Sequence, residues 1–412
     1  MTPWLEYLWI PGAVAVGAVA VQALVMTFNF VMRHTHEVSR RQGERELLHE
    51  RVMAARRESA AREEKSLSWS GFRKFEIVKK CVEDAKGEIC SFYLAPHDRK
   101  PIPGFAPGQY LTFSVAVPDE PKPIVRCYSL SDAPRPDHYR VTIKRAPAPA
   151  LASSFFLDQL EEGSICDVRA PTGHFFLDLS RPTPVVLIGG GIGVTPVLSM
   201  LNAICETPGM RETWFFYGVR DAAELTMREH LETIEREHPN INVRICYSRV
   251  PPEEIPDGVC HIPGRVTAEL LKTHLPSNNY DFLFCGPKPM MDGLCADLAE
   301  WGVPTDRLHF EDFGPAAGTP TIDPNASTGP LITFKKSNKT INWNESAESL
   351  WHLAAANGID IEAGCRCGAC GTCERAIIDG AVEYTKPTTW EYEDGACLTC
   401  CCVPKGPVEL DA

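Results

Sequence analysis

The sequence predicts a multidomain chain: an apolar N-terminal helix, an antiparallel β-barrel, a doubly wound α/β domain and a small α+β domain. Three observations support this. The N-terminal region holds an uncharged apolar run, short alternating strands later give way to strand–helix units, and four cysteines fall within nine residues near the C-terminus. A chain of 412 residues has room for several domains. The predicted parts are an anchor helix (1–33), a charged helical stalk (34–67), the barrel (68–180), the α/β domain (181–316), a linker (317–330) and the C-terminal domain (331–412).

Charge and cysteine usage narrow the class of protein. The formal net charge is −13, which argues against nucleic acid as a partner because binding a phosphate backbone needs a positive face. Eight of the 17 cysteines lie between Cys365 and Cys402. A secreted disulfide framework would spread paired cysteines through a small domain. The uneven pattern indicates a reduced compartment and one metal site.

The apolar run from Trp9 to Phe28 contains no charged residue. Twenty helical residues span about 30 Å, the thickness of the hydrocarbon layer of a membrane. Arginines follow the run, at Arg33, Arg40 and Arg41. The positive-inside rule therefore predicts a single-pass anchor in the cell inner membrane, in contact with lipid, with the N-terminus outside and the catalytic domains cytoplasmic. A cleaved signal peptide and a buried core helix are the alternatives.

Short alternating strands are predicted at residues 75–82, 89–95, 109–115 and 139–145, separated by Pro, Gly and Asp turns. Between them lies R-C-Y-S-L-S, from Arg126 to Ser131. Arg126 offers a guanidinium fork to a phosphate, Tyr128 can stack on an aromatic ring, and Ser129 can hydrogen-bond a ring nitrogen. The alternative is an ordinary strand with an exposed arginine.

The next segment, P-V-V-L-I-G-G-G-I-G-V-T-P, predicts a nucleotide-binding turn. A buried strand, residues 185–188, runs into a glycine loop, and we expect Thr195 to cap a helix that begins at Pro196. Glycines allow the backbone to approach a pyrophosphate at the helix N-terminus. Further strand–helix units, with helices from about Ala222 and from Pro289, predict a parallel, doubly wound sheet.

Six motifs over residues 68–316 resemble the ferredoxin–NADP reductase family, in its flavohaemoglobin-like and oxygenase-reductase branch. They are G-Q-Y, R-C-Y-S, G-G-G-I-G-V-T-P, F-Y-G-V-R, F-C-G-P and E-D-F-G. The resemblance implies a flavin in the barrel and NADH or NADPH in the α/β domain. It favours FAD over FMN because Phe313 lies in the extended tail typical of FAD-binding relatives.

The same resemblance implies roles for individual residues. Arg126 would hold a flavin phosphate, Tyr128 and Phe313 would cover the two faces of the isoalloxazine, and Ser129 would contact its N5. Ser153 keeps the hydroxyl of the second flavin-phosphate turn, although Ala150 stands where the family usually has glycine. The predicted dinucleotide-binding residues are Gly191, Gly193 and Thr195, with Cys285 and Gly286 beside the nicotinamide.

The cysteine loop reads A-G-C-R-C-G-A-C-G-T-C. Its spacing, Cys365-x4-Cys370-x2-Cys373 with Cys400 after 26 residues, is that of a plant-type [2Fe–2S] site. Structural zinc sites usually pair two C-x2-C knuckles, and disulfides conflict with a cytoplasmic location. A hairpin from L-I-T-F and T-I-N-W and a helix ended by Gly358 are predicted before the loop. No role is assigned to the extra cysteines Cys367, Cys397, Cys401 and Cys402.

The order of these parts predicts a membrane-anchored reductase. Electrons would pass from NAD(P)H to FAD, then to the [2Fe–2S] cluster, and then to a membrane-associated acceptor: a monooxygenase, hydroxylase or desaturase. One alternative is a dehydrogenase that reduces a quinone or a cytochrome directly. A second, from another class, is a non-catalytic metal-binding membrane scaffold.

Overall fold

The computed structural model describes residues 67–412, except 119, 121–122, 149–150, 257, 259, 312, 314–321, 324–325, 365, 367, 369–370, 386–387, 389 and 391, together with five helical positions between 22 and 32. The chain forms two compact units, residues 1–67 and 68–412. Among the described residues, no helix combines the length and the apolar character that a bilayer crossing needs. The predicted anchor and stalk lie almost wholly outside these residues.

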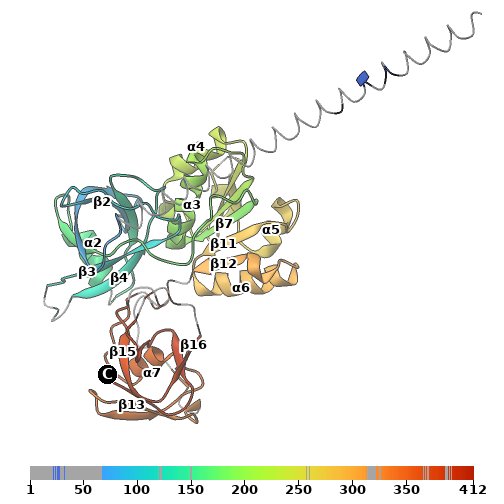
Figure 1. Cartoon of the computed structure of the whole chain (residues 1–412). Helices are drawn as coiled ribbons and strands as arrows, with labels where there is room; N and C mark the ends of the chain where they lie inside the picture. The colour runs from blue at the N-terminus through green and yellow to red at the C-terminus, as the bar shows by residue number, and fades with distance from the viewer. Residues whose placement is uncertain are drawn as a thin grey trace, which may run out of the picture. The chain divides into compact units, whose positions relative to one another are not determined.

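The second unit begins with an antiparallel β-barrel (Figure 1). Its strands are β1 (Arg73–Val82), β2 (Ile89–Pro96), β3 (Tyr110–Val115), β4 (Ile124–Ser129), β5 (Tyr139–Lys144) and β6 (Ile165–Val168). They are arranged in the order β4-β3-β6-β1-β2-β5. An antiparallel bridge between Leu130 and Val141 joins the two outer strands, so the sheet closes on itself. The four predicted strand segments are confirmed.

The interior of the barrel is aromatic, because alternate residues of each strand point inward. Helix α2 (Leu151–Gln159) contributes Phe156, whose ring meets Phe92 and Phe113 edge to face, with centroids 5.6 and 5.3 Å away. Phe75, Phe92, Phe113 and Phe156 are all fully buried. Neither α2 nor β6 was predicted from the sequence, because both are short and neither has a clear apolar period.

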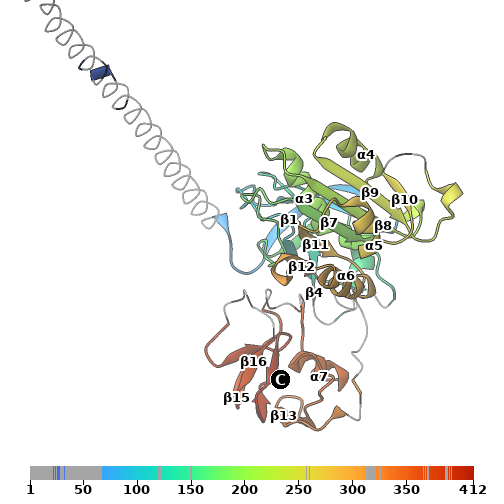
Figure 2. The ribbon, with the colours of Figure 1, turned by 90° about the vertical axis from the view of Figure 1, so that its right-hand side faces the viewer.

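A parallel sheet follows the barrel (Figure 2). Its strands are β7 (Val185–Gly190), β8 (Thr213–Val219), β9 (Ile241–Tyr247), β10 (His261–Pro263), β11 (Asp281–Cys285) and β12 (Leu308–Glu311). In the order β10-β9-β8-β7-β11-β12, the chain moves outward from β7 to β10 and then returns to the other side of β7. The strand order therefore reverses between β7 and β11, and ligands of doubly wound sheets bind at such a point.

Helices cover both faces of this sheet, as predicted (Figure 1). They are α3 (Val194–Glu206), α4 (Arg228–Glu237), α5 (Ala268–His274) and α6 (Lys288–Glu300). Leu187 of β7 packs in the core shared with α3 and α4, whereas Ile188 packs with α5 and α6. Adjacent residues serve opposite cores because successive strand side chains point to opposite faces.

Two predicted helix starts are wrong. Thr195 does not cap α3: the helix begins at Val194, because the 3₁₀ turn η2 (Gly191–Gly193) runs directly into it, and the Thr195 hydroxyl donates to the carbonyl of Ile192 (3.0 Å). The helix expected from Ala222 is only the 3₁₀ turn η3 (Ala222–Glu224), and α4 starts at Arg228.

The C-terminal part has a mixed sheet of β13 (Leu331–Phe334), β14 (Lys339–Asn342), β15 (Glu374–Asp379), β17 (Ala396–Leu398) and β19 (Val408–Leu410), in the order β14-β13-β19-β15-β17. A second pair joins β16 (Val382–Tyr384) to β18 (Cys402–Pro404). Helix α7 (Leu350–Ala356) is capped by Ser349, whose hydroxyl accepts from the His352 amide (3.2 Å). Gly358 follows with a φ of +66°. The predicted hairpin and helix are confirmed.

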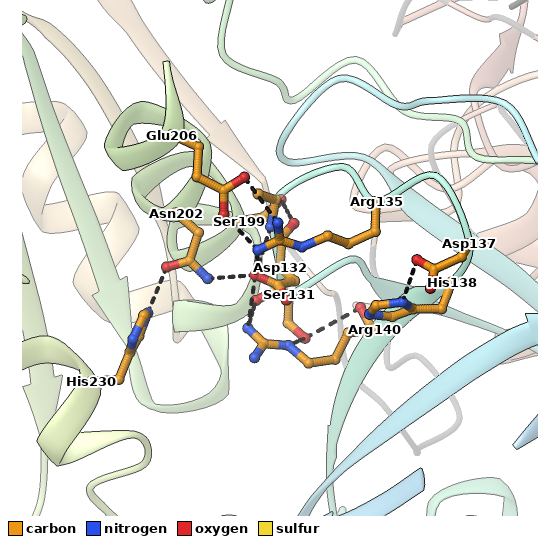
Figure 3. A network of polar contacts seen from close by, with 11 residues as sticks. Ser131, Asp132, Arg135, Asp137, His138, Arg140, Ser199, Asn202, Glu206 and His230 are labelled. Carbon is orange, nitrogen blue, oxygen red and sulfur yellow. Dashed lines mark hydrogen bonds and ion pairs between the residues drawn. The ribbon is translucent and has the colours of Figure 1, made fainter. Parts of the chain in front are cut away.

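A polar network joins the barrel to α3 and α4 (Figure 3). Ser199 donates to the main-chain carbonyl of Asp132 (2.7 Å), and Asn202 donates to its carboxylate (2.8 Å). Arg135 forms two hydrogen bonds with Glu206, of 3.0 and 2.5 Å. The network fixes the barrel against the first helix of the nucleotide-binding sheet.

We expect Asp132→Ala to lower the free energy of unfolding by about 1–3 kcal/mol, because it leaves buried hydrogen-bond partners unsatisfied. The Asp132 side chain is only 14% exposed, and Arg140 lies 3.8 Å from its carboxylate. Urea unfolding measures the change. Asp137→Ala is the control, because Asp137 is 76% exposed and its carboxylate contacts only the neighbouring His138 within the described network. Equal effects of the two variants would contradict a stabilising role for the network.

Candidate functional site

One cleft of about 1970 Å³ collects most of the predicted binding residues. Its volume is about twice the upper end of the usual range for a pocket that takes one ligand, about 300–1,000 Å³. The cleft can therefore hold more than one cofactor-sized molecule. Nine of the ten predicted flavin- and nucleotide-binding residues line it: Arg126, Tyr128, Ser129, Ser153, Gly191, Gly193, Thr195, Gly286 and Phe313.

Strand β4 supplies the barrel wall of the cleft. The ring of Tyr128 is held edge to face by Phe113 and Phe156, with centroids 5.6 and 5.3 Å away. Burial raises the pKa of Tyr128 above its usual range, so its hydroxyl stays protonated at neutral pH. Ser129 is nearly buried and pairs with Tyr110 of β3, which also lines the cleft. A fixed aromatic ring beside a hydroxyl suits a flat heteroaromatic ligand.

The first turn of α2 forms another part of the wall. Ser153 lies in this turn, and its hydroxyl accepts a hydrogen bond from the amide of Ala146 (3.1 Å). The N-terminus of a helix attracts anions, which fits the predicted second contact with a flavin phosphate. Ala150, which replaces the family's glycine, lies outside the described residues.

The glycine loop meets the end of β11 at the point where the strand order reverses. A Cβ atom on Gly193 would lie 2.6 Å from the carbonyl carbon of Cys285 and 2.7 Å from the Cα of Gly286. The φ of Gly193 is −62°, so the close approach, and not the backbone conformation, excludes a side chain here. Cys285 is fully buried and does not itself line the cleft. Its main chain lies against the glycine loop, and its predicted contact with a nicotinamide stays a prediction.

Charged groups bridge the barrel and the α/β part across the cleft. Lys144 of β5 pairs with Glu224 of η3 (3.1 Å), and Glu224 also binds Arg220. The same carboxylate therefore holds the Arg220 guanidinium, and both side chains line the cleft.

The cysteine loop reaches the same cleft. Ala363, Gly364 and Arg366 contribute to its lining, although none of them was predicted as a flavin- or nucleotide-binding residue. The guanidinium of Arg366 stacks on Trp351, 4.2 Å from the ring centroid. Burial and the nearby charge of Arg126 lower the pKa of Arg366. Two guanidinium groups this close repel one another, so this corner of the cleft favours an anionic ligand.

Two of the four predicted metal ligands are among the described residues. The sulfur atoms of Cys373 and Cys400 lie 3.2 Å apart, and both side chains are buried. Two thiolates that share one tetrahedral metal ion at about 2.3 Å lie no more than about 4 Å apart, so this pair fits one iron. Cys365 and Cys370 lie outside the described residues.

An aromatic residue links the cysteine loop to the barrel. The ring of Trp390 lies 4.9 Å from the guanidinium of Arg169, which also contacts Phe72 at 4.7 Å. On its other side, the ring leaves no room for a Cβ on Gly371, a residue of the cysteine loop with a φ of +72°. No local sequence signal identifies this contact, because Arg169 and Trp390 are far apart in the chain.

Comparison with protein families identifies two domains. Residues 187–296 match the oxidoreductase NAD-binding domain, and residues 332–405 match the 2Fe-2S iron-sulfur cluster binding domain. The chain is therefore an oxidoreductase. The second match supports iron–sulfur over the zinc and disulfide alternatives for the cysteine loop.

Relatives share about three fifths of the chain. A flavohemoprotein of Bacillus thuringiensis subsp. konkukian is 36% identical over 253 residues, or 60% of this chain and 62% of the relative. A flavohemoprotein of Bordetella pertussis is 37% identical over 60% of this chain and 61% of the relative. This chain thus spans less than two thirds of the curated relatives that it matches.

Solved structures give the same picture. The FAD/NAD-binding domain of a nitric oxide dioxygenase from Vibrio cholerae is 28% identical, with a TM-score of 0.54, over 60% of this chain and 100% of that domain. Phthalate dioxygenase reductase is 24% identical, with a TM-score of 0.53, and covers 83% of this chain and 98% of its own. The second likeness concerns the fold alone, and it covers more of this chain than the first.

Proposed function

We propose that the protein takes hydride from NAD(P)H and passes electrons through FAD and one [2Fe–2S] cluster to an acceptor protein, a monooxygenase, hydroxylase or desaturase. One observation carries the proposal: the barrel motif, the glycine loop and the cysteine loop all line a single cleft. When bound, FAD accepts electrons as a pair and releases them singly, as a one-electron cluster requires.

In this scheme, the residues of the chain bind and orient the cofactors and shield the flavin ring. Arg126 and Arg366 hold phosphate charge, and Tyr128 and Phe313 flank the flavin ring. The close contact of Gly193 with the end of β11 brings a dinucleotide to the carboxyl ends of the strands, at the N-terminus of α3. Ala363 and Gly364 bring the cluster loop to the same space.

The similar proteins support each part of the route. The Vibrio cholerae protein contributes an FAD/NAD-binding domain, and phthalate dioxygenase reductase transfers electrons from pyridine nucleotides to [2Fe–2S]. A self-sufficient cytochrome P450 monooxygenase shares the fold over 83% of this chain, with a TM-score of 0.57 and 22% identity. An oxygenase-type acceptor agrees with these neighbours.

Anaerobic titration of the purified protein with NADH and NADPH tests the core of the proposal. We expect bleaching of the flavin absorbance, followed by the electron paramagnetic resonance signal of a reduced [2Fe–2S] cluster. Protein that contains zinc and no flavin would support the scaffold alternative. Rapid quinone reduction without a partner protein would support the dehydrogenase alternative.

The membrane part of the proposal rests on the uncharged residues 9–28 and the arginines that follow. The anchor would hold the catalytic domains at the cytoplasmic face of the inner membrane and raise the effective concentration of a membrane-bound acceptor. Fractionation of cells that express the full chain, and a variant without residues 1–33, tests it. Recovery of the full chain in the soluble fraction would contradict the anchor.

Arg126→Ala is expected to weaken flavin binding about 10- to 100-fold. Charge-assisted hydrogen bonds contribute about 1.5–3 kcal/mol, and each 1.4 kcal/mol is tenfold in Kd. Fluorescence titration of the apoprotein with FAD measures the Kd. Arg181→Ala removes the same charge from a side chain that is 73% exposed and does not line the cleft, so it should leave the Kd unchanged. A wild-type Kd for Arg126→Ala would refute the phosphate contact.

A further inference from the structure

Four cysteines follow one another closely at the edge of the predicted cluster site: Cys397, Cys400, Cys401 and Cys402. All are buried, and Cys397, Cys401 and Cys402 are fully so. Only Cys400 belongs to the predicted ligand set. Its sulfur lies 3.2 Å from that of Cys373 and 3.5 Å from that of Cys401. The second distance is a hydrogen-bonding distance between sulfur atoms.

The backbone of Cys401 is held in place on both sides. Its amide donates to the carbonyl of Leu398 (2.9 Å), and its carbonyl accepts from the amide (2.9 Å) and the hydroxyl (3.2 Å) of Thr385. These bonds close a tight turn in which two consecutive cysteines present their sulfurs to the same side. The turn therefore places the Cys401 thiol beside the sulfur of Cys400.

Gly368, in the cysteine loop, lies close to the sulfur of Cys401. A Cβ on this residue would lie 3.1 Å from that sulfur. The Cys401 thiol therefore lies beside the predicted cluster ligands and not in a remote part of the hydrophobic core.

We propose that the Cys401 thiol donates a hydrogen bond to the sulfur of Cys400 and so raises the reduction potential of the cluster. A cysteine that ligates iron has lost its proton, so Cys401 must be the donor of the pair. Reduction adds negative charge to the cluster and its sulfurs, and a donor stabilises that charge. The proposal rests on the [2Fe–2S] cluster of the proposed function.

The test is a potentiometric titration of the full-length protein, followed by electron paramagnetic resonance of the reduced cluster. We expect Cys401→Ala to disfavour cluster reduction about tenfold, a fall of about 59 mV for one electron. Cys401→Ser keeps a donor and should stay close to the wild-type potential. Cys402→Ala removes the next buried thiol and should not shift the potential.

Iron and flavin content are measured on every variant. An unchanged potential in Cys401→Ala, or an equal fall in Cys401→Ser, overturns the proposal. It also fails if Cys401→Ala loses iron while Cys400→Ala retains it, because Cys401 would then be the ligand. Wild-type protein without iron would instead overturn the proposed function.

Discussion

Cys373→Ala is expected to remove the iron–sulfur cluster while FAD stays bound. Cys373 and Cys400 place their sulfurs 3.2 Å apart in a buried site, so each would supply a thiolate to the same iron. Alanine offers no ligand, and a [2Fe–2S] cluster needs four. Iron analysis should fall to background. Loss of a residue that only hydrogen-bonds a metal ligand typically costs about 10- to 100-fold in activity at metal sites. Because Cys373 is itself a predicted ligand, the rate of electron transfer to a one-electron protein acceptor should fall by more than this.

Cys397→Ala is the matched control. It removes the same sulfur atom from a fully buried position in the same core, but from a residue outside the predicted ligand set. Any loss of stability from the cavity should therefore be similar in the two variants. Wild-type iron content in Cys373→Ala, or equal iron loss in both variants, would contradict the ligand assignment. NAD(P)H-driven reduction of the flavin should persist in both, because the cluster acts after it.

Gly193→Ala is expected to slow the reduction of the flavin by NAD(P)H about 100-fold. The new Cβ would meet only main-chain atoms, at 2.6 and 2.7 Å, and these atoms belong to the end of β11 and the residue after it. Main chain cannot rotate away as a flexible side chain can, so the glycine loop and β11 must separate. A displacement of about 1 Å between reacting groups can cost about 100-fold in rate. Stopped-flow absorbance measures the rate.

Gly293→Ala is the control for this variant. Gly293 lies in α6 and lines the same cleft, but a Cβ there meets no atom within 4 Å. The variant should keep the wild-type rate, and the helix should gain up to about 1 kcal/mol of stability. Reduction by dithionite must remain normal in both variants, which shows that FAD is in place. A wild-type rate in Gly193→Ala would show that the β7–β11 contact does not position the dinucleotide.

Local patterns predicted much of the fold. Alternation along β1, β2, β3 and β5 identified the barrel, and a buried strand followed by glycines identified β7 and its turn. These predictions hold because one side of each strand must be apolar to form a core. The prediction of a helix from Ala222 failed because the chain leaves the helical region at Leu225, where ψ is 112°, and Met227 has a left-handed φ of 54° before α4 begins.

The residues of the candidate site also fall into two groups, those that local sequence motifs predicted and those that they missed. The motif residues Arg126, Tyr128, Ser129 and Phe313 were predicted as binding residues, and the structure places them in one cleft. Arg366 and Trp390 were missed, because each matters through a partner far away in the sequence: Arg126 and Arg169, respectively. Such contacts form only when folding brings distant segments of the chain together.

The amino-acid sequence alone determined the order of the parts, the glycine turn and the spacing of the cysteines, since each follows from residue types and their positions along the chain. The tertiary structure decided that three separate motifs share one cleft and that the sulfur atoms of Cys373 and Cys400 lie 3.2 Å apart. These facts depend on distances between chain segments that only the packing of complete cores brings together.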